Sequence, residues 1–524
     1  MATESVSHPD ANRSTEPLPR LATTVVIVLC AAKFLLHALT SLHRYGYFRD
    51  ELYLLDCGRH LAWGYVDMAP LSAVYARIAL LMGGSLPALR ILPALAGTAL
   101  IALTMLITRQ LGGSRFAQAL AGFCVFLVPV NIVMDDFLSM NSFEPLFWMG
   151  CVYVLIRIVR TGNSKLWLWF GLLAGLGLEN KHSTLFFGFA VFLAVALTGL
   201  RREFAKPWIW IGGAIALLIF APNLVWQIHR NFPTLQDLEN VRRSGKNVVL
   251  TPLAFSAQQI FMEQPILFPF WFAGLGSFLW GRGKKFRVLG VMFLIFFATL
   301  LILHGKDYYV APIYPMLFAG GAVATEGWLG RRRWARERPW PKAAIITAVI
   351  LLGGLLVPLV TPMLSPEKYL AYARVIRLHA GKTEVAESGP LPQFFGDQFG
   401  WRSIVRQVAD IYNSLPPDER SKTGIFTGNY GEAGAINLFG PQYGLPRAYS
   451  RHQNYWYWGP PKEHYTNLIV VQWSLQDVKD NCTSWQAYEH YSRFGMAEEN
   501  TPIYLCRDAE FDLQKVWWHY RHWN

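Results

Sequence analysis

The chain has 524 residues, of which 53% are hydrophobic, 15% aromatic and only 16% charged. Soluble domains carry about 25% charged residues, so this deficit indicates that lipid is the solvent for much of the chain. The formal net charge is +13. In a soluble protein that charge would favour nucleic-acid binding. Here the basic residues lie mostly in connections between apolar segments, where they set membrane topology. We therefore exclude nucleic acid as a partner.

Long apolar segments follow a polar stretch, residues 1–20, which we expect to be a disordered cytoplasmic tail. A hydrocarbon core of about 30 Å needs about 20 helical residues to cross it. The first apolar segment is too long for a signal peptide and lacks a small-residue cleavage site. About eleven segments are predicted to span the membrane: 21–42, 86–108, 115–134, 143–160, 165–180, 183–200, 207–228, 265–281, 287–304, 309–328 and 343–362.

Basic residues occupy alternate connections between these segments. The connections "RQLGGSR", "RIVRTGNSK", "GLRREFAKP", "GRGKKFR" and "GRRRWARERPWPK" are rich in Arg and Lys, whereas "DDFLSMNS", "ENKHS" and "HGKDYY" are not. The positive-inside rule places the basic connections in the cytoplasm. We therefore expect a multi-pass protein of the inner (plasma) membrane with a cytoplasmic N-terminus. An odd number of spans places the C-terminal region outside.

Three regions are then extracytoplasmic: the loops 43–85 and 229–264, and the tail 363–524. In the tail, "WRSIVRQVADIYNSL" has helical periodicity and "NLIVVQW" is typical of a buried strand. We expect an α/β domain docked on the membrane domain 21–362. Cys482 and Cys506 lie in this tail, where an oxidising exterior permits a disulfide, although two reduced core thiols fit equally well.

The first external loop opens with an acid pair among aromatic residues, in "YGYFRDELYLLDCGRHLAWGYVDMAPL". Asp50 and Glu51 can simply complement the dipole of a short helix. However, "DELYLLDCGRHLAWG" can also form an interfacial helix whose leucines face the membrane. That helix would hold both acids at the membrane–water boundary, within reach of a lipid headgroup.

This stretch, "RDELY…GRHLAWGYVDMAPL", resembles the first external loop of the GT-C membrane glycosyltransferases. The similar branch includes protein O-mannosyltransferases, lipid A aminoarabinose transferases and lipopolysaccharide-core galacturonosyltransferases. "GNYGEAGAINLFG" and "NYWYWGP" extend the resemblance to the tail. It implies a polytopic α-helical membrane protein of the GT-C type with a C-terminal extracytoplasmic α/β domain. It also implies a polyprenyl-phosphate-linked sugar as donor. One departure is Ala69, which stands where relatives often have a proline.

The resemblance also implies roles for the loop residues. Asp50 corresponds to the general base that takes a proton from the acceptor hydroxyl, and Glu51 to its partner acid. Proton removal of this kind contributes about 10²–10⁴-fold to a rate. The leaving phosphate needs cationic neighbours and no general acid, so we expect single displacement with inversion. Tyr53, Trp63 and Asp67 are candidates for binding sugar or acceptor.

A second acidic position is Glu144 in "SMNSFEPLFW", which resembles the family's acid in the catalytic cavity. A first-turn acid before Pro145 is the structural alternative. Since carboxylates suit hard cations, Asp50, Asp136 and Glu144 are candidate metal ligands, with Asp135 beside them. No cofactor is certain from the sequence, and a divalent metal stays an open question.

Few cations lie at the predicted outer ends of the membrane helices, so each is a candidate for binding the donor phosphate. They are Arg90, Lys181 and Lys306. Each can instead be an interfacial cation whose charged end reaches water. Lys33 and His37 lie four residues apart inside the first apolar segment, where an ionisable group is costly and function is the default hypothesis.

The sequence thus favours a glycosyltransferase that moves a sugar from a polyprenyl phosphate to an extracytoplasmic lipid, glycan or protein acceptor. The alternative is a transporter or flippase for lipid-linked saccharides, which would place charges along a central path and break helices near the midplane. A third hypothesis is a non-catalytic envelope scaffold with a sugar-binding tail. It predicts that Asp50→Asn leaves function intact.

Overall fold

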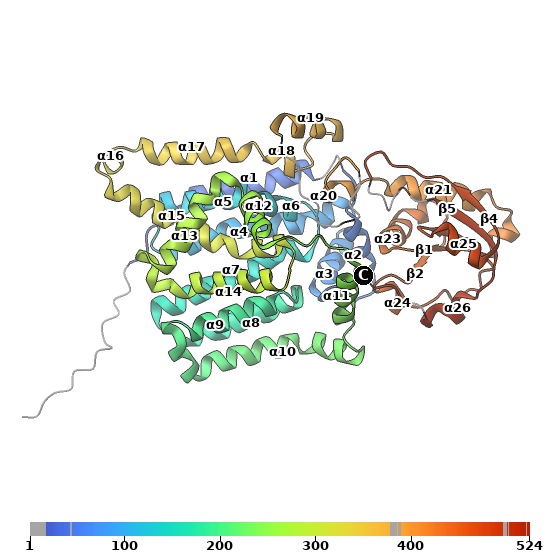
Figure 1. The fold of residues 1–524 in the computed structure, drawn as a ribbon, viewed down its shortest axis with the longest axis horizontal. Coiled ribbons are helices and arrows are strands. Elements are labelled where there is room, and N and C mark those ends of the chain that lie inside the picture. The colour runs from blue at the N-terminus through green and yellow to red at the C-terminus, as the bar shows by residue number, and fades with distance from the viewer. Residues whose placement is uncertain are drawn as a thin grey trace, which may run out of the picture.

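The computed structural model describes residues 17–41, 45–377, 385, 389–495, 500, 502–519 and 521–523. It has two parts, a long helical bundle and a smaller C-terminal α/β domain at one end of it (Figure 1). All eleven predicted apolar segments contain a helix. The helices are α1(Thr23–Thr40), α4(Leu86–Gln110), α5(Arg115–Leu127) with α6(Pro129–Asp135), α7(Met140–Thr161), α8(Trp167–Asn180), α9(Thr184–Ala196), α10(Pro207–His229), α13(Phe268–Leu279), α14(Arg287–Ile302), α15(Tyr314–Arg331) and α17(Trp340–Gly354).

Five helices in the described part of the chain are long and apolar enough to cross a membrane, or seven if each sharply bent helix pair is one span. One such pair is α5 and α6, which meet at an angle of 64°. Val128 lies at the break, with φ −67° and ψ 117°, because the residue before a proline avoids helical dihedrals. The structure is thus a multi-pass membrane protein, and eleven spans stay a prediction.

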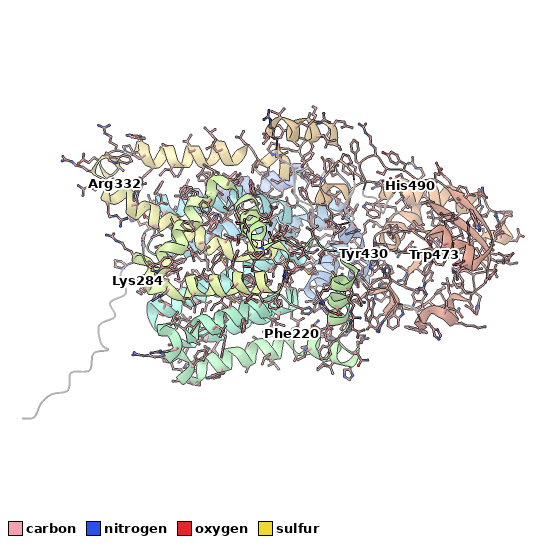
Figure 2. The ribbon with its side chains drawn as sticks, in the orientation of Figure 1. Phe220, Lys284, Arg332, Tyr430, Trp473 and His490 are labelled. Atoms are coloured by element: carbon pink, nitrogen blue, oxygen red, sulfur yellow. A yellow bond between two sulfur atoms is a disulfide. The ribbon has the colours of Figure 1, made fainter. Side chains whose placement is uncertain are left out.

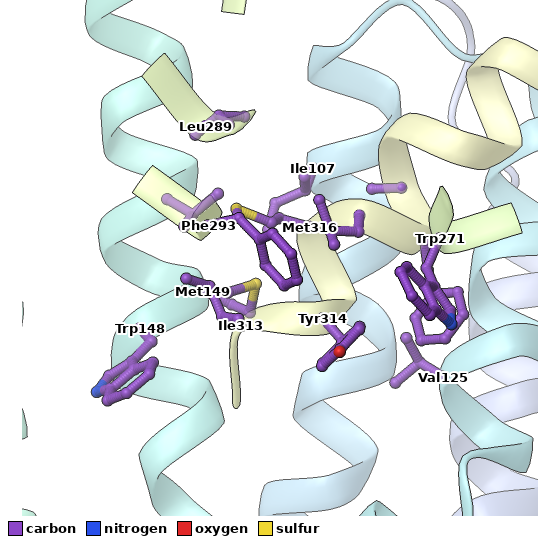
Figure 3. Packing of buried hydrophobic residues seen from close by; sticks show 14 of the residues in the cluster. Ile107, Val125, Trp148, Met149, Trp271, Leu289, Phe293, Ile313, Tyr314 and Met316 are labelled. Atoms are coloured by element: carbon purple, nitrogen blue, oxygen red, sulfur yellow. The ribbon is translucent and has the colours of Figure 1, made fainter. Parts of the chain in front are cut away.

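The interior of the bundle is apolar and rich in aromatic rings. Trp148 stacks on Phe187 with ring centroids 4.7 Å apart and meets Phe296 edge-on. Figure 3 shows Met149, Phe293, Ile313 and Met316 packed in the same region. The outer surface is apolar as well: α10 exposes Leu217 and Leu218, which a soluble protein would bury. Lipid contact explains this pattern.

Most of the short helices outside the bundle gather at the end that faces the C-terminal domain, where Tyr430 lies (Figures 1 and 2). Lys284 and Arg332, from two of the basic connections, lie at the opposite end (Figure 2). These two basic connections and the tail therefore lie at opposite ends, as the topology predicts. The gathered helices are α2(Arg49–Arg59), α3(Leu71–Leu81), α11(Pro233–Ser244), α18(Val357–Val360), α19(Pro366–Ile376) and α20(Gln393–Gly396), whereas α12(Pro252–Met262) lies over the bundle and α16(Arg333–Arg336) lies at the opposite end.

The tail contains a five-stranded sheet of order β2-β1-β3-β5-β4. The pairs β1–β2 and β1–β3 are parallel, and β3–β5 and β4–β5 are antiparallel. The strands are β1(Thr423–Thr427), β2(Ala448–Ser450), β3(Asn467–Val471), β4(Cys482–Tyr488) and β5(Ile503–Ala509), and the helices are α21(Trp401–Ser414), α22(Pro417–Arg420), α23(Tyr430–Phe439), α24(Tyr455–Trp458), α25(Leu475–Asn481) and α26(Leu513–Val516).

Both elements predicted for the tail are present. The helix predicted from "WRSIVRQVADIYNSL" is α21, which buries Ile404, Val405, Val408 and Ile411. The strand predicted from "NLIVVQW" is β3, whose five residues are all buried at the centre of the sheet. The α/β domain that the sequence predicted is thereby confirmed.

Cys482 and Cys506 form a disulfide between β4 and β5, 24 residues apart in sequence. This settles the two alternatives in favour of the bridge. Closing a loop of this length stabilises a domain by about 3 kcal/mol in the chain-entropy model. We expect the double variant Cys482→Ser, Cys506→Ser to lose about that much stability in denaturant unfolding monitored on the tail. Unchanged unfolding, with the wild-type bridge verified by mass spectrometry, would contradict this.

Candidate active site

The site is built on α2, the helix that carries the Asp-Glu pair. Its first turn is closed by Glu51, whose Oε2 accepts a hydrogen bond from the backbone N of Phe48 at 2.9 Å. Three residues of α2 are spaced three positions apart and therefore lie along one side of the helix: Asp50, Tyr53 and Asp56. That side meets the tail, because each of the three contacts a tail residue.

Asp50 is the accessible acid of the pair, with 42% of its side chain exposed. The Tyr430 hydroxyl donates to its Oδ1 at 2.8 Å, and Arg49 Nε lies 3.9 Å from the same oxygen. Burial raises the pKa of Tyr430 well above its usual value, although nearby Arg49 opposes the rise. Tyr430 thus stays a neutral donor that orients Asp50, and Asp50 is open to an incoming acceptor.

Glu51 has a different environment from Asp50 although the two are adjacent. Its side chain is 0% exposed and forms a two-pronged ion pair with Arg90: Nε to Oε1 at 3.1 Å and Nη2 to Oε2 at 2.9 Å. The backbone N of Leu138 also donates to Oε1 at 3.0 Å. Both carboxylate oxygens are therefore occupied, and Glu51 serves to anchor α2.

Arg90, which the sequence predicts to be a phosphate ligand, is instead the partner of Glu51 in this ion pair. Besides Glu51, its guanidinium donates to the carbonyl oxygens of Ser41 and Gly46 and to the Gln398 side chain, at 2.8–3.2 Å. It is 2% exposed. This geometry favours a structural role, because donor phosphate would have to displace several buried hydrogen bonds.

Glu144 and Lys181, predicted separately as an acid and a phosphate ligand, form a second buried ion pair at 2.8 Å. Lys181 Nζ also donates to Asn141 and lies 4.2 Å from the Tyr309 ring centroid. Ser183 donates to Glu144. A small cavity lined by Glu144, Asn141, Asp135 and Tyr308 adjoins the pair.

The other predicted binding residues are spread around these clusters. Lys306 is partly exposed and precedes η5(Asp307–Ile313), whose Tyr309 contacts Lys181. Trp63 is 66% exposed, and among the described residues no other aromatic ring stacks on it. Tyr53 is buried and donates to Asp67 Oδ1 at 3.1 Å. The structure thus joins Tyr53 to Asp67 and leaves Trp63 apart.

Asp67 is the most strongly perturbed carboxyl group of the site. Burial raises its pKa to about 7, and the negative charges of Asp237 and Asp50 add to the rise. The hydrogen bond from Tyr53 acts in the opposite direction. These surroundings favour the protonated form of Asp67 more than those of an ordinary aspartate do.

The three candidate metal ligands are not gathered. Asp136 Oδ1 accepts hydrogen bonds from Ser41 and pairs with His37 at 2.8 Å, and neighbouring Asp135 pairs with Lys33 at 2.9 Å. Glu144 is paired with Lys181. Within the described ranges, no group of three or more His, Cys, Asp or Glu is placed to hold a metal ion. Asp50, Asp136 and Glu144 therefore do not form one site.

These contacts account for the presence of Lys33 and His37 inside the first apolar segment without a bound ligand. Both side chains are 1% exposed, and both point from α1 to the acids at the end of α6. The break before Pro129 directs α6 to this position. Ionisable and polar groups within a membrane domain pair in this way to reduce the cost of desolvation.

Tail residues contribute to the site in ways that the sequence did not predict. Tyr430 donates to Asp50, and Tyr455 and Asn437 donate to Asp56. The aromatic run Tyr455–Trp458 is α24, and its Tyr455 is buried, so this run is mainly a docking surface. Asp50 and Asp56, six residues apart on one face of α2, were the available signal for a partner on that face.

Gly434 permits the close approach of α23 to α2. A Cβ added there would lie 2.7 Å from the Leu52 carbonyl carbon. We expect Gly434→Ala to destabilise the docked tail by about 1–3 kcal/mol, as in other overpacked contacts. The control is Gly188→Ala in α9, where a Cβ meets nothing within 4 Å. Equal thermal unfolding of the two variants would refute the close-contact explanation.

Comparisons with known proteins agree with this architecture. The model of the dolichyl-phosphate-mannose-protein mannosyltransferase family matches residues 67–226. The structure of ArnT from Cupriavidus metallidurans in the apo state superposes with a TM-score of 0.58 at 16% identity, covering 92% of this chain and 98% of that one. ArnT bound to undecaprenyl phosphate gives 0.56 at 14% identity, covering 92% and 97%. No curated protein matches the sequence.

At these identities the likeness establishes the fold. The chain has the GT-C fold of membrane glycosyltransferases, including the C-terminal sheet domain, as the resemblance of its first external loop predicted. The similarity covers nearly the whole of both chains, so bundle, external loops and tail belong to one architecture.

Proposed function

We propose that this protein is an inverting glycosyltransferase that moves one sugar from a polyprenyl-phosphate donor to an extracytoplasmic acceptor. The observation that carries the proposal is the environment of Asp50. It is an exposed carboxylate at the membrane-domain end that meets the tail, and a neutral tyrosine orients it. The fold it shares with ArnT bound to undecaprenyl phosphate supports the same donor class.

Asp50 acts as the general base in this proposal. The acceptor hydroxyl attacks the anomeric carbon while Asp50 takes its proton, and the bond from that carbon to the phosphate oxygen breaks. The leaving group departs as a phosphate anion. Glu51 and Arg90 take no direct part and hold α2 in place.

The donor phosphate would lie near Lys181 and Lys306, at the outer ends of membrane helices. Lys181 already neutralises Glu144, so its net contribution to an anion is reduced. Lys306 is the more accessible of the two. The positive-inside rule supports assigning this end to the extracytoplasmic side and the N-terminus to the cytoplasm.

A panel of polyprenyl-phosphate sugars tests the proposal. Purified protein in lipid vesicles is incubated with each donor and with envelope lipid, glycan or peptide acceptors, and the products are followed by mass spectrometry. We expect one donor to be consumed, with inverted anomeric configuration in the product by NMR. Retained configuration would refute the single-displacement mechanism. Donor that crosses the bilayer unchanged would favour the transporter.

A further inference from the structure

The helix α11 of the second external loop runs across the bundle. Figure 1 shows it beside the end of α10 that lies nearest the tail, with its axis crosswise to α8 and α10. Only residues 230–232 separate the two helices, so α11 begins where α10 ends. Because α10 has the length and apolarity of a membrane span, a helix crosswise to its outer end lies parallel to the membrane surface.

The sharp turn between α10 and α11 has a local cause. Asn231 and Phe232 have φ values of 57° and 53°, in the left-handed region that residues with side chains rarely adopt. The backbone N of Phe232 donates to the Gln227 carbonyl oxygen at 2.7 Å and closes the turn. Pro233 then begins α11, since its fixed φ suits the first turn of a helix. The turn therefore sets the direction of α11.

One side of α11 is held by the tail. Asp237 Oδ1 accepts a hydrogen bond from Gln453 Nε2 at 3.0 Å, and Asn240 Nδ2 donates to the Trp523 carbonyl oxygen at 2.8 Å. Asp237 and Asn240 are three residues apart and therefore share one side of the helix. The opposite side of α11 consequently faces away from the tail.

That opposite side is apolar and exposed. Leu235 and Leu238 expose 60% and 59% of their surface. Each precedes one of the two tail-bound residues by two positions, which is about 200° around the helix. Arg242 follows Leu238 by four residues and lies on the same side. We call these three residues the α11 stripe, and neighbouring exposed leucines of this kind mark an interaction surface.

The neighbouring surface indicates that lipid is the occupant of the α11 stripe. Exposed apolar side chains run along α10 up to the turn and continue into α11. They are Leu217, Leu218, Leu224, Val225, Ile228, Phe232, Leu235 and Leu238. Since α10 is an apolar span, its exposed side chains contact acyl chains. The α11 stripe continues that surface at the level of the headgroups.

The charge of α11 indicates the kind of lipid. Arg242 and Arg243 expose 76% and 74% of their side chains, and both pair with Glu239. Two guanidinium groups against one carboxylate leave one net positive charge. The positive-inside rule does not account for these arginines, because they belong to an external loop. A long arginine side chain can lie along an apolar surface while its charged end reaches the phosphate layer.

We propose that the α11 stripe is a binding surface for anionic phospholipids of the outer leaflet. Leu235 and Leu238 enter the boundary between headgroups and acyl chains, and Arg242 meets the phosphate groups. Because the other side of α11 holds the tail, this helix joins the tail to the lipid surface. The inference goes beyond the transfer reaction and does not depend on it.

Fluorescence quenching by brominated lipids tests the proposal without enzymatic turnover. Leu238→Cys is labelled with a thiol-reactive fluorophore and reconstituted into vesicles of equal parts phosphatidylcholine and phosphatidylglycerol. We expect lipid that is brominated in its acyl chains to quench the label. Wild-type protein treated with the same reagent measures the background from its own free cysteines.

The matched control is Leu475→Cys on α25, an exposed leucine on the part of the tail far from the bundle (Figure 1). Neither lipid should quench its label. A Leu238 label that brominated lipid leaves unquenched would overturn the proposal. If that label were also shielded from iodide in the water, a second copy of the chain would be the occupant instead.

The headgroup preference is tested with the Leu238 label by brominating one lipid at a time. One net positive charge near the surface should enrich phosphatidylglycerol over phosphatidylcholine around the label by about fivefold. The double variant Arg242→Gln, Arg243→Gln should abolish that preference. Arg333→Gln, which breaks a similar exposed pair with Glu337 at the opposite end of the bundle, should retain it.

Thermal unfolding in detergent verifies that each of these variants is folded. Equal quenching by the two brominated lipids, with both arginines of α11 in place, would overturn the assignment of the surface to anionic lipid.

Discussion

Asp50→Asn is expected to lower the turnover number by about 10²–10⁴-fold, the usual contribution of a general base. Asparagine has nearly the same size and still accepts a hydrogen bond from Tyr430, but it cannot take a proton from the acceptor. Since Asp50 is partly exposed, stability and donor binding should remain close to the wild type. The measurement is kcat with a single donor, together with donor affinity by titration.

The matched control is Asp410→Asn, which removes an exposed carboxylate from α21 in the tail and should leave kcat unchanged. Tyr430→Phe removes the donor to Asp50 and should lower kcat by less than Asp50→Asn does. Wild-type turnover in Asp50→Asn would contradict the assignment of the base and would support the scaffold hypothesis.

Arg90→Met is expected to have the largest effect on stability. Methionine fills a similar volume but leaves the Glu51 carboxylate buried without its charged partner, which typically costs about 3–5 kcal/mol. The anchor that joins α2, α4 and the tail residue Gln398 is lost with it. Denaturant unfolding of the protein in detergent measures the loss.

The control for Arg90 is Arg242→Met, because Arg242 pairs with Glu239 on the surface with 76% of its side chain exposed. Such exposed pairs contribute only about 0–1 kcal/mol. If Arg90→Met were instead as stable as the wild type and had lost donor binding, Arg90 would be the phosphate ligand that the sequence analysis predicted.

The positions of the membrane helices could be predicted from the sequence because length and apolarity are local properties. The eleven segments from 21–42 to 343–362 all contain helices for that reason. The break at Val128 was not predicted, although Pro129 is its local cause. The positive-inside pattern likewise predicted that Asp50 lies at the end opposite the basic connections, since that pattern depends only on charge along the chain.

The contacts of the candidate site could not be predicted in the same way, because its partners are distant in sequence. Arg90 and Glu51 are 39 residues apart, His37 and Asp136 are 99 apart, and Tyr430 and Asp50 are 380 apart. The sequence identifies Arg90 and Lys181 as two of the few cations at the predicted outer ends of the membrane helices. Only the fold reveals that acids on neighbouring helices already pair with both.

The different surroundings of the two adjacent acids also depend on residues that are distant in sequence, such as Tyr430 and Arg90. Asp50 and Glu51 are adjacent in the motif, yet Asp50 stays 42% exposed beside the tail and Glu51 is enclosed by Arg90, Phe48 and Leu138. A helix turns by about 100° per residue, so consecutive side chains necessarily meet different surroundings. The sequence named both as catalytic, and the geometry favours Asp50.

In the proposed reaction, Asp50 drives sugar transfer from a polyprenyl phosphate. This role of Asp50 is tested most directly by the release of free polyprenyl phosphate from the polyprenyl-phosphate sugar by protein in vesicles, with acceptor present, for the wild type and Asp50→Asn. Release that is stoichiometric with glycosylated acceptor and reduced by at least about 100-fold in Asp50→Asn is the predicted result. Equal release by both proteins would contradict the claim.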